Sequence, residues 1–358
     1  LCDEMTIVIV GSFAREGGMP LPADARVVPL RSPAGADFRR KLSVVAHLPY
    51  YLGRIGAEVR RSDVVHTPLP GDLPLLGLVA ALLTGRRVFA LYNGSWTPNS
   101  ETTVMNRVTR QAMRLLARGR NVMLAVGDGA TPPAPGMEWL FATSLTRAEL
   151  KAHRPVLDRG LSSPPRMMYA GRLSVEKGLP IMLEALAQLR REGVAPLPRL
   201  TLAGGGPELA ALESLSRSLG IEGLVRFSGQ LDRAGLEGEM RSADFCIHSS
   251  HSEGYCKAWL DAMAQGLPVL TTEVGAAREV VGGAGERGWL VPPGDPAALA
   301  DALRRLLAGP EDWPALRRRC RDFAASRSLE AWAEQIARVC TERWHVRFGG
   351  PLPEPGVS

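Results

Sequence analysis

Short apolar runs alternate with helical patterns along nearly the whole chain, and this alternation limits the fold more than any other feature. Thr6–Val10 is almost continuously apolar, as expected of a strand covered on both faces. Similar runs recur at Arg87–Tyr92, Val122–Val126, Met167–Ala170, Leu200–Ala203 and Leu224–Phe227. Strands that alternate with helices build parallel sheets. A length of 358 residues suits two domains, so we expect two doubly wound α/β halves.

Composition and charge are those of a soluble globular enzyme, with 45% apolar and 22% charged residues. The net charge of +6 is unevenly distributed, because residues 1–160 hold 20 Lys and Arg against 13 Asp and Glu, and the rest holds 23 against 24. This surplus favours an anionic partner of the N-terminal part, such as a phospholipid surface or a phosphate-bearing acceptor. The alternative explanation of this positive charge is that the source proteome is rich in Arg, since only four residues of the chain are Lys.

The cysteines and the apolar runs indicate a cytoplasmic protein. Five cysteines are scattered without any C-x-x-C, so we expect reduced thiols and no zinc site. The longest uncharged apolar run, Leu73–Gly85, is too short to span a bilayer, and no signal-peptide pattern opens the chain. We therefore expect the protein in the cytoplasm, with the inner face of the membrane as a possible location.

Two strand–loop–helix segments carry residues suited to binding anions. Residues 244–272 predict strand Phe245–His248, a helix from Cys256 to Gln265, and strand Val269–Thr271. The loop places Glu253 and the N–H groups of residues 254–257 at a helix N-terminus, which suits phosphate or sugar oxygens. The second segment follows Met167–Ala170 and contains Arg172 and Lys177 before helix Pro180–Arg191. The alternative is two surface cations paired with Glu176.

Both segments resemble signatures of the retaining glycosyltransferases of family four, which have the GT-B fold of two Rossmann-like domains facing across a cleft. The pattern is E-G-F and E-A-M-A-x-G-x-P-V, with seven residues between the two Glu positions. It is resembled by Glu253-Gly254-Tyr255, Asp261-Ala262-Met263-Ala264 and Gly266-Leu267-Pro268-Val269, with seven positions between Glu253 and Asp261. Gly171-Arg172-Leu173 with Lys177-Gly178 resembles G-R-L-x-x-x-K-G. Asp261 stands where the family usually has Glu. The resemblance is specific over about residues 166–307 and only topological before them.

The resemblance implies roles for individual residues. Arg172 and Lys177 would bind the donor diphosphate, and Glu253 would orient the sugar at its anomeric carbon. Asp261 would bind the ribose diol. Further donor-binding residues are Gly17, Gly18, Gln230, Leu231, Gly254, Tyr255, Cys256, Lys257 and Ala258, and His66 and Asn93 are candidates for the sugar and acceptor side.

Two of these assignments have alternatives, and a third residue departs from the family pattern. Gly17-Gly18 also suits a plain flexible turn, and its spacing does not fit the dinucleotide pattern G-x-G-x-x-G, which argues against a dehydrogenase. His66 also suits a structural role. Asn93 stands where many relatives have His, and an amide cannot shuttle protons near neutral pH.

The implied reaction is transfer of a sugar, with retention, from a nucleotide-sugar to a hydroxyl acceptor. We expect a UDP-sugar slightly more than a GDP-sugar, and a lipid-linked or cell-surface glycan precursor as acceptor. The sequence has no D-x-D and no metal-ligand spacing, so we expect neither a metal nor a cofactor. Nucleic acid is not an expected partner. The alternatives are an inactive or weakly active nucleotide-sugar-binding protein, suggested by Asn93 and Asp261, and a sugar-nucleotide epimerase.

The expected organisation follows the same resemblance. Residues 1–160 would form an acceptor-binding domain and residues 161–328 a nucleotide-sugar-binding domain. A helix within residues 329–348 would cross back to the first domain, before a tail at 349–358. Locally, Pro49 should divide the helix Phe38–Ile55, and Asp295 should cap the helix Ala297–Leu307. Gly204-Gly205-Gly206-Pro207 is expected to form a tight turn, with Pro207 at a first helical position.

Overall fold

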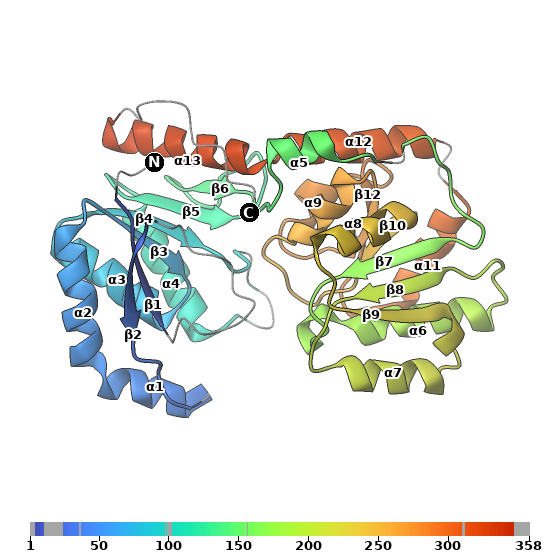
Figure 1. Ribbon diagram of the computed structural model, residues 1–358, viewed down its shortest axis with the longest axis horizontal. Helices are drawn as coiled ribbons and strands as arrows, with labels where there is room; N and C mark the ends of the chain where they lie inside the picture. The colour runs from blue at the N-terminus through green and yellow to red at the C-terminus, as the bar shows by residue number, and fades with distance from the viewer. Residues whose placement is uncertain are drawn as a thin grey trace.

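The computed structural model describes residues 4–10, 24–35, 37–96, 98, 102–155, 157–309 and 312–346. Figure 1 shows two α/β bodies side by side, one blue to cyan and one green to orange. The helices α12 (Trp313–Ala325) and α13 (Leu329–Trp344) extend along one side of both. This architecture confirms the predicted α/β class with two domains. Within the described ranges, no helix is long and apolar enough to cross a bilayer.

The C-terminal domain is built on a parallel sheet of six strands in the order β12-β11-β10-β7-β8-β9. The strands are β7 (Arg166–Ala170), β8 (Arg199–Ala203), β9 (Val225–Gly229), β10 (Phe245–His248), β11 (Val269–Thr272) and β12 (Gly288–Val291). From β7 the chain winds outward through β8 and β9, then returns to β10 beside β7 and winds the other way. In such sheets ligands bind at the carboxyl ends of the two strands where the order reverses. Here these strands are β7 and β10.

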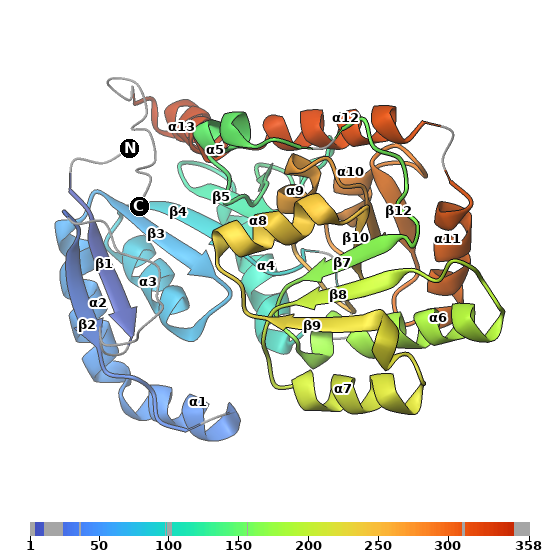
Figure 2. The same cartoon turned by 45° about the vertical axis from the view of Figure 1, so that its right-hand side comes forward.

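Helices cover both faces of this sheet (Figure 2). They are α6 (Leu179–Arg191), α7 (Leu209–Ser218), α8 (Arg233–Ser242), α9 (Lys257–Ala264), α10 (Ala277–Val281) and α11 (Pro296–Leu307), with short 3-10 turns η1 (Val175–Lys177) and η2 (Glu222–Leu224). In α6, Leu179, Met182, Leu183 and Leu186 recur at helical spacing and are all buried. Burial of one such side chain contributes about 1.5–3 kcal/mol, so the apolar periodicity accounts for this packing.

Two local predictions about helix starts have different outcomes. The carboxylate of Asp295 accepts a hydrogen bond from the Ala298 N–H at 2.9 Å, and Pro296 opens α11, so the predicted cap is confirmed. The prediction for Pro207 is wrong. Helix α7 begins at Leu209 after Glu208, because Gly206 and Pro207 belong to a turn that lies against the backbone of Leu173.

The N-terminal domain has a four-stranded parallel sheet and a separate pair of strands. The sheet has the order β3 (Val64–Leu69), β4 (Arg87–Tyr92), β5 (Val122–Val126), β6 (Glu138–Leu140), and the pair is β1 (Thr6–Val10) with β2 (Arg26–Leu30). Its helices are α1 (Asp37–Ala46), α2 (Leu48–Arg61), α3 (Asp72–Leu83), α4 (Val104–Leu116) and α5 (Arg147–Ala152). Helix α1 ends one residue before α2, whose second residue is Pro49, so the predicted division of this helix is confirmed.

The prediction that Thr6–Val10 is covered on both faces is wrong. Four of the five residues of β1 are exposed, among them Val8, Ile9 and Val10. The strand pairs only with β2 and is not hydrogen-bonded to the four-stranded sheet in the described part of the chain. Apolar sequence alone therefore did not reveal which strands are central.

Helix α13 lies against the N-terminal domain, although it follows the C-terminal one in sequence (Figure 1). The Gln335 side-chain amide donates to the Trp139 carbonyl at 2.7 Å, and the Trp344 indole donates to the Arg120 carbonyl at 2.6 Å. Arg327, between α12 and α13, binds the carboxylate of Asp128 at 2.7 and 2.9 Å. These contacts fix α13 and the residues just before it to the first domain.

Candidate active site

The two candidate anion-binding loops lie next to each other because β7 and β10 are neighbours. Phe245 pairs with Met167 and Cys246 with Met168, so the loops after the two strands begin at the same edge of the sheet. Gly178 makes this approach possible. Its φ is +59°, and a Cβ there would lie 2.2 Å from the carbonyl oxygen of Ser249. Only glycine fits both the conformation and the space.

Lys177 and Glu253 form an ion pair across these two loops. The Lys177 Nζ lies 2.6 Å from the Glu253 Oε1, and the Ser250 hydroxyl donates to the same oxygen at 2.9 Å. Only 22% of the lysine side chain and 10% of the glutamate side chain are exposed. Burial lowers the pKa of Lys177, but the Glu253 carboxylate outweighs burial, and the pKa is raised overall. Lys177 is therefore an ammonium ion near neutral pH.

The alternative partner for the two cations, Glu176, has a different contact. Its carboxylate accepts a hydrogen bond from the Ser174 hydroxyl at 2.6 Å, and this bond lowers the pKa of Glu176. Arg172 is exposed at the same loop, and its carbonyl accepts from the Tyr169 hydroxyl at 2.7 Å. The loop thus presents a second cation close to Lys177 in sequence.

The loop after β10 ends at the N-terminus of α9. Cys256 is the N-cap, and its side chain makes no capping hydrogen bond to the helix. The first N–H groups of a helix have no partners within the helix, and the positive end of its dipole lies there. Glu253, Lys177 and this helix end are therefore grouped at the switch point of the sheet, an arrangement suited to a phosphate and a sugar.

The profile of the family described as "Glycosyl transferases group 1" matches residues 159–327. The phosphatidyl-myo-inositol mannosyltransferase of Mycobacterium leprae is 33% identical over 290 residues, which cover 77% of this chain and 69% of that protein. The chain belongs to the group 1 glycosyltransferases.

Solved structures agree with this assignment at the level of the fold. Sucrose-phosphate synthase from Thermosynechococcus elongatus superposes with a TM-score of 0.71 over 93% of this chain and 87% of that one, at 21% identity. Anabaena HepE in complex with UDP-glucose superposes with a TM-score of 0.68 over 95% of this chain and 100% of that one, at 20% identity. The fold of this group 1 glycosyltransferase is GT-B, as its sequence motifs implied.

In this glycosyltransferase Asn93 also lies beside the C-terminal loop. It directly follows β4, and a Cβ on Gly254 would lie 3.3 Å from the Asn93 carbonyl oxygen and 3.1 Å from that of Gly94. The two domains therefore approach each other at Gly254. Tyr255, the next residue, is buried, and burial raises the pKa of its hydroxyl.

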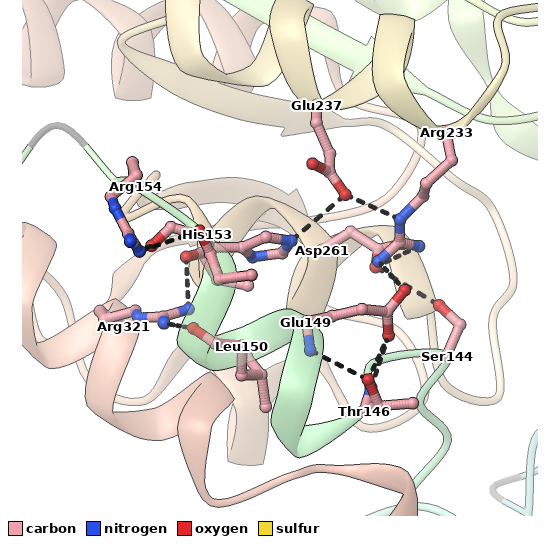
Figure 3. A network of polar contacts seen from close by, with 12 residues as sticks. Ser144, Thr146, Glu149, Leu150, His153, Arg154, Arg233, Glu237, Asp261 and Arg321 are labelled. Carbon is pink, nitrogen blue, oxygen red and sulfur yellow. Dashed lines mark hydrogen bonds and ion pairs between the residues drawn. The ribbon is translucent and has the colours of Figure 1, made fainter. Parts of the chain in front are cut away.

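Asp261 is held by residues that the sequence analysis did not connect with it (Figure 3). Its Oδ1 lies 3.6 Å from a guanidinium nitrogen of Arg233, and the Ser144 hydroxyl donates to it at 3.4 Å. Only 15% of its side chain is exposed, and burial raises its pKa while Arg233 acts in the opposite direction. Lys257, one turn earlier on α9, also lowers the pKa of Asp261.

His66 lies inside β3 rather than at its end. The strand continues to Leu69. The imidazole stacks on Phe89 at 4.6 Å and contacts the Phe89 carbonyl through Nδ1 at 3.1 Å. Burial lowers the pKa of His66. These contacts favour the structural alternative.

The remaining candidates are placed as follows. Gln230 is exposed and Leu231 is half-buried directly after β9, at the same edge of the sheet as the two loops. Cys256 and Ala258 are half-buried at the start of α9, and Lys257 is exposed. Gly17 and Gly18 lie outside the described residues. Among the described residues, no three His, Cys, Asp or Glu side chains are arranged to hold a metal ion.

His248 is a buried residue near this site that sequence reasoning did not single out. Its Nε2 lies 3.2 Å from the Ala170 carbonyl oxygen, and its two ring nitrogens lie 3.7 and 3.8 Å from the sulfur atoms of Cys246 and Cys256. Burial lowers its pKa to about 4, so the ring is neutral. Its place at the end of a predicted strand was the available signal.

Proposed function

We propose that this group 1 glycosyltransferase moves a sugar from a nucleotide-sugar to a hydroxyl acceptor, with retention of configuration and without a metal ion. The observation that carries the proposal is the Lys177–Glu253 pair at the switch point, next to the N-terminus of α9. A cation and a carboxylate side by side can bind the two groups that a glycosyl phosphate bond joins, the phosphate and the sugar. The cation suits the leaving phosphate, and the carboxylate suits the hydroxyls of the sugar.

The diphosphate would be held by protein groups alone. Arg172 and Lys177 supply two positive charges, and the first N–H groups of α9 supply donors without a charge of their own. Stabilisation of charge that develops on a leaving group is usually a large catalytic contribution, and one donor is worth about 3–4 kcal/mol in the measured oxyanion case. These groups would take the place of a metal ion.

Glu253 and Asp261 would bind the two parts of the donor outside the diphosphate, the transferred sugar and the ribose. Glu253 would exchange its contact with Lys177 for the sugar hydroxyls, and Asp261 would bind the ribose diol, directly or through a water. In the retaining reaction the leaving phosphate would accept the proton of the acceptor hydroxyl on the same face of the sugar. A double displacement with Glu253 as nucleophile is the less favoured route.

The acceptor is proposed to be a lipid-linked or cell-surface glycan precursor bound by the N-terminal domain. The positive charge of this part supports an anionic acceptor or contact with an anionic membrane. On α1, exposed Leu42 and Val45 adjoin exposed Arg39, Arg40 and Lys41. The mycobacterial relative is named for a phosphatidyl-inositol substrate. We propose a UDP-sugar as donor, because HepE was solved with UDP-glucose.

Calorimetric titration with a panel of nucleoside diphosphates tests the donor site. We expect one of them, UDP before GDP, to bind without added metal. Assays of donor consumption with and without acceptor glycans then separate transfer from binding alone, and the anomeric configuration of the product tests retention. Failure of every nucleoside diphosphate to bind would overturn the proposal, and an inverted product would overturn the retaining mechanism.

A further inference from the structure

One guanidinium group contacts three carboxylates that come from three different segments (Figure 3). The Arg233 Nε lies 2.9 Å from Glu237 Oε1 on the same helix, α8. Its Nη2 lies 3.5 Å from Glu149 Oε1 on α5, and its Nη1 lies 3.6 Å from Asp261 Oδ1 on α9. All three nitrogens of this side chain are therefore directed at carboxylates. Such a fork matches several carboxylate oxygens at once, which a lysine cannot do.

The contact to Glu149 links Asp261 to residues 144–152, which include α5 and lie at the end of the N-terminal domain, just before the chain enters the C-terminal domain; we call them the connecting segment. Glu149 is fixed by a capping box, in which its carboxylate accepts from the Thr146 N–H at 2.7 Å and from the Thr146 hydroxyl at 2.9 Å. Ser144, earlier in the same segment, donates to Asp261 itself. The carboxylate of Asp261 thus lies between α8 and the connecting segment, and both hold it.

The charges at this cluster are unbalanced without Arg233. Asp261, Glu149 and Glu237 together contribute three negative charges. His153 contacts Glu237 at 3.2 Å with only 6% of its side chain exposed, and Lys257 acts on Asp261 from one turn earlier on α9. Within the part of the chain that the structure describes, only Arg233 contacts all three carboxylates. Because burial raises the pKa of Asp261 and the Arg233 charge lowers it, this contact helps to keep Asp261 ionised.

We propose that Arg233 is a positioning residue for the nucleotide, holding the Asp261 carboxylate ready for the ribose hydroxyls and tying it to the connecting segment through Glu149. This inference rests on the proposed donor site. An ionised carboxylate accepts hydrogen bonds from both hydroxyls of a diol, and a protonated one has less acceptor capacity. Arg233 would therefore act on the ribose and leave the diphosphate contacts of Arg172 and Lys177 unchanged.

The test compares three ligands in calorimetric titrations, namely the nucleoside diphosphate that the unmodified protein binds, its 2′,3′-dideoxy analogue and inorganic pyrophosphate. We expect Arg233→Ala to weaken the complete nucleotide about tenfold and the other two ligands by less than about twofold. The loss should grow as the pH is lowered, because Asp261 without the Arg233 charge takes up a proton more readily. Arg233→Lys should restore only part of the affinity.

The matched control is Arg226→Ala. Arg226 is an exposed arginine of the same domain that pairs with Glu239 and donates to the Thr201 hydroxyl at 3.3 Å, outside this cluster. It should leave all three affinities unchanged. If Arg233→Ala does not fold, Arg233→Lys serves instead and should lower affinity selectively for the ligand with the ribose diol.

Equal losses for the complete nucleotide and its dideoxy analogue would overturn the inference while leaving the proposed function intact. Unchanged affinity of Arg233→Ala at every pH would do the same. If the unmodified protein binds no nucleoside diphosphate, the proposed function fails first, and the role of Arg233 fails with it. The two failures are therefore distinguishable by the behaviour of the unmodified protein.

Discussion

At the scale of single residues, the contact between Lys177 and Glu253 links the two motifs that were separate in sequence. Each side chain is largely buried, and each neutralises the other at 2.6 Å. An unpaired buried charge is costly, so neither residue is expected to tolerate removal of its partner without compensation. A bound glycosyl phosphate offers such compensation to both residues at once, because it presents negative oxygens and sugar hydroxyls together.

Replacement of Lys177 tests this view most directly. We expect Lys177→Ala to lower turnover at least 100-fold, because about 3 kcal/mol of leaving-group stabilisation is lost. Circular dichroism and thermal unfolding should show a folded protein. Lys151→Ala, which removes an exposed lysine of α5, is the control and should keep normal turnover. A near-normal rate for Lys177→Ala would contradict the assignment.

A short series at Asp261 separates donor binding from simple ion pairing. Asp261→Glu should keep or improve the affinity for the nucleotide, because it restores the length usual in the family. Asp261→Ala should weaken binding, because the ribose diol loses an acceptor while Arg233 and Ser144 lose a partner. Calorimetry on the three proteins gives the comparison, and three equal dissociation constants would exclude a role in binding the donor.

His248 should make folding stability depend on pH. Its pKa is about 4 in the folded protein against 6.5 in an unfolded chain, so the unfolded state binds more protons between these values. Stability is then complete above about pH 6.5 and is lost as the pH falls towards 4, by about 3 kcal/mol. His248→Gln should flatten the fall of Tm between pH 7 and 5, whereas His345→Gln, at an exposed histidine, should not. Parallel curves for all three proteins would refute this.

At the scale of helices and strands, the predictions were most accurate where apolar runs end sharply. Strands β4, β5 and β10 have the predicted bounds, because each is a compact apolar run that polar residues or glycines follow. The sequence analysis did not find β2, which Pro29 interrupts, or α8, whose sequence RAGLEGEMRS has two glycines and little apolar periodicity. Missing α8 also hid the contact between Arg233 and Asp261.

The candidate site could be predicted from the sequence only in part. Motifs at the carboxyl ends of parallel strands lie at one edge of a sheet, and the family resemblance assigned Lys177 and Glu253 to one donor site there. Their direct ion pair, and the approach of Asn93 to Gly254, depend on how the loops and the domains pack. Nothing local in the sequence encodes these contacts between residues far apart in the chain.

Substitutions at Gly178 and Gly193, which have similar positive φ angles, distinguish the cost of a steric clash from the cost of backbone strain. Gly193, after α6, has φ +72° with no atom within 4 Å of an added Cβ, so Gly193→Ala should cost about 1 kcal/mol from strain alone. Gly178→Ala adds a clash with the Ser249 carbonyl and should cost about 2 kcal/mol more. Denaturant unfolding measures both. Equal losses would mean that the loops after β7 and β10 separate without cost.

At the scale of the whole molecule, the two domains are in contact at more than one place. Arg327 binds Asp128 of the N-terminal domain and stacks over Phe323 at 4.3 Å, while Gly254 adjoins Asn93 and Gly94. The connecting segment with α5 also contacts α13, through Arg147 and Glu334 at 2.7 Å. A ligand bound at the switch point would thus contact elements that are already joined to the other domain.

The whole protein should work without divalent metal ions. The donor diphosphate needs positive charge as its bond to the sugar breaks, and Arg172, Lys177 and the N-terminus of α9 provide it at fixed positions. We expect EDTA to leave turnover unchanged in the presence of donor and acceptor, and added Mg²⁺ or Mn²⁺ to change it by less than about twofold. Lys177→Ala should not be rescued by either ion, because a bound ion needs oxygen ligands beyond the diphosphate itself. Inhibition by EDTA that Mn²⁺ reverses would show that an ion, rather than these residues, neutralises the leaving group.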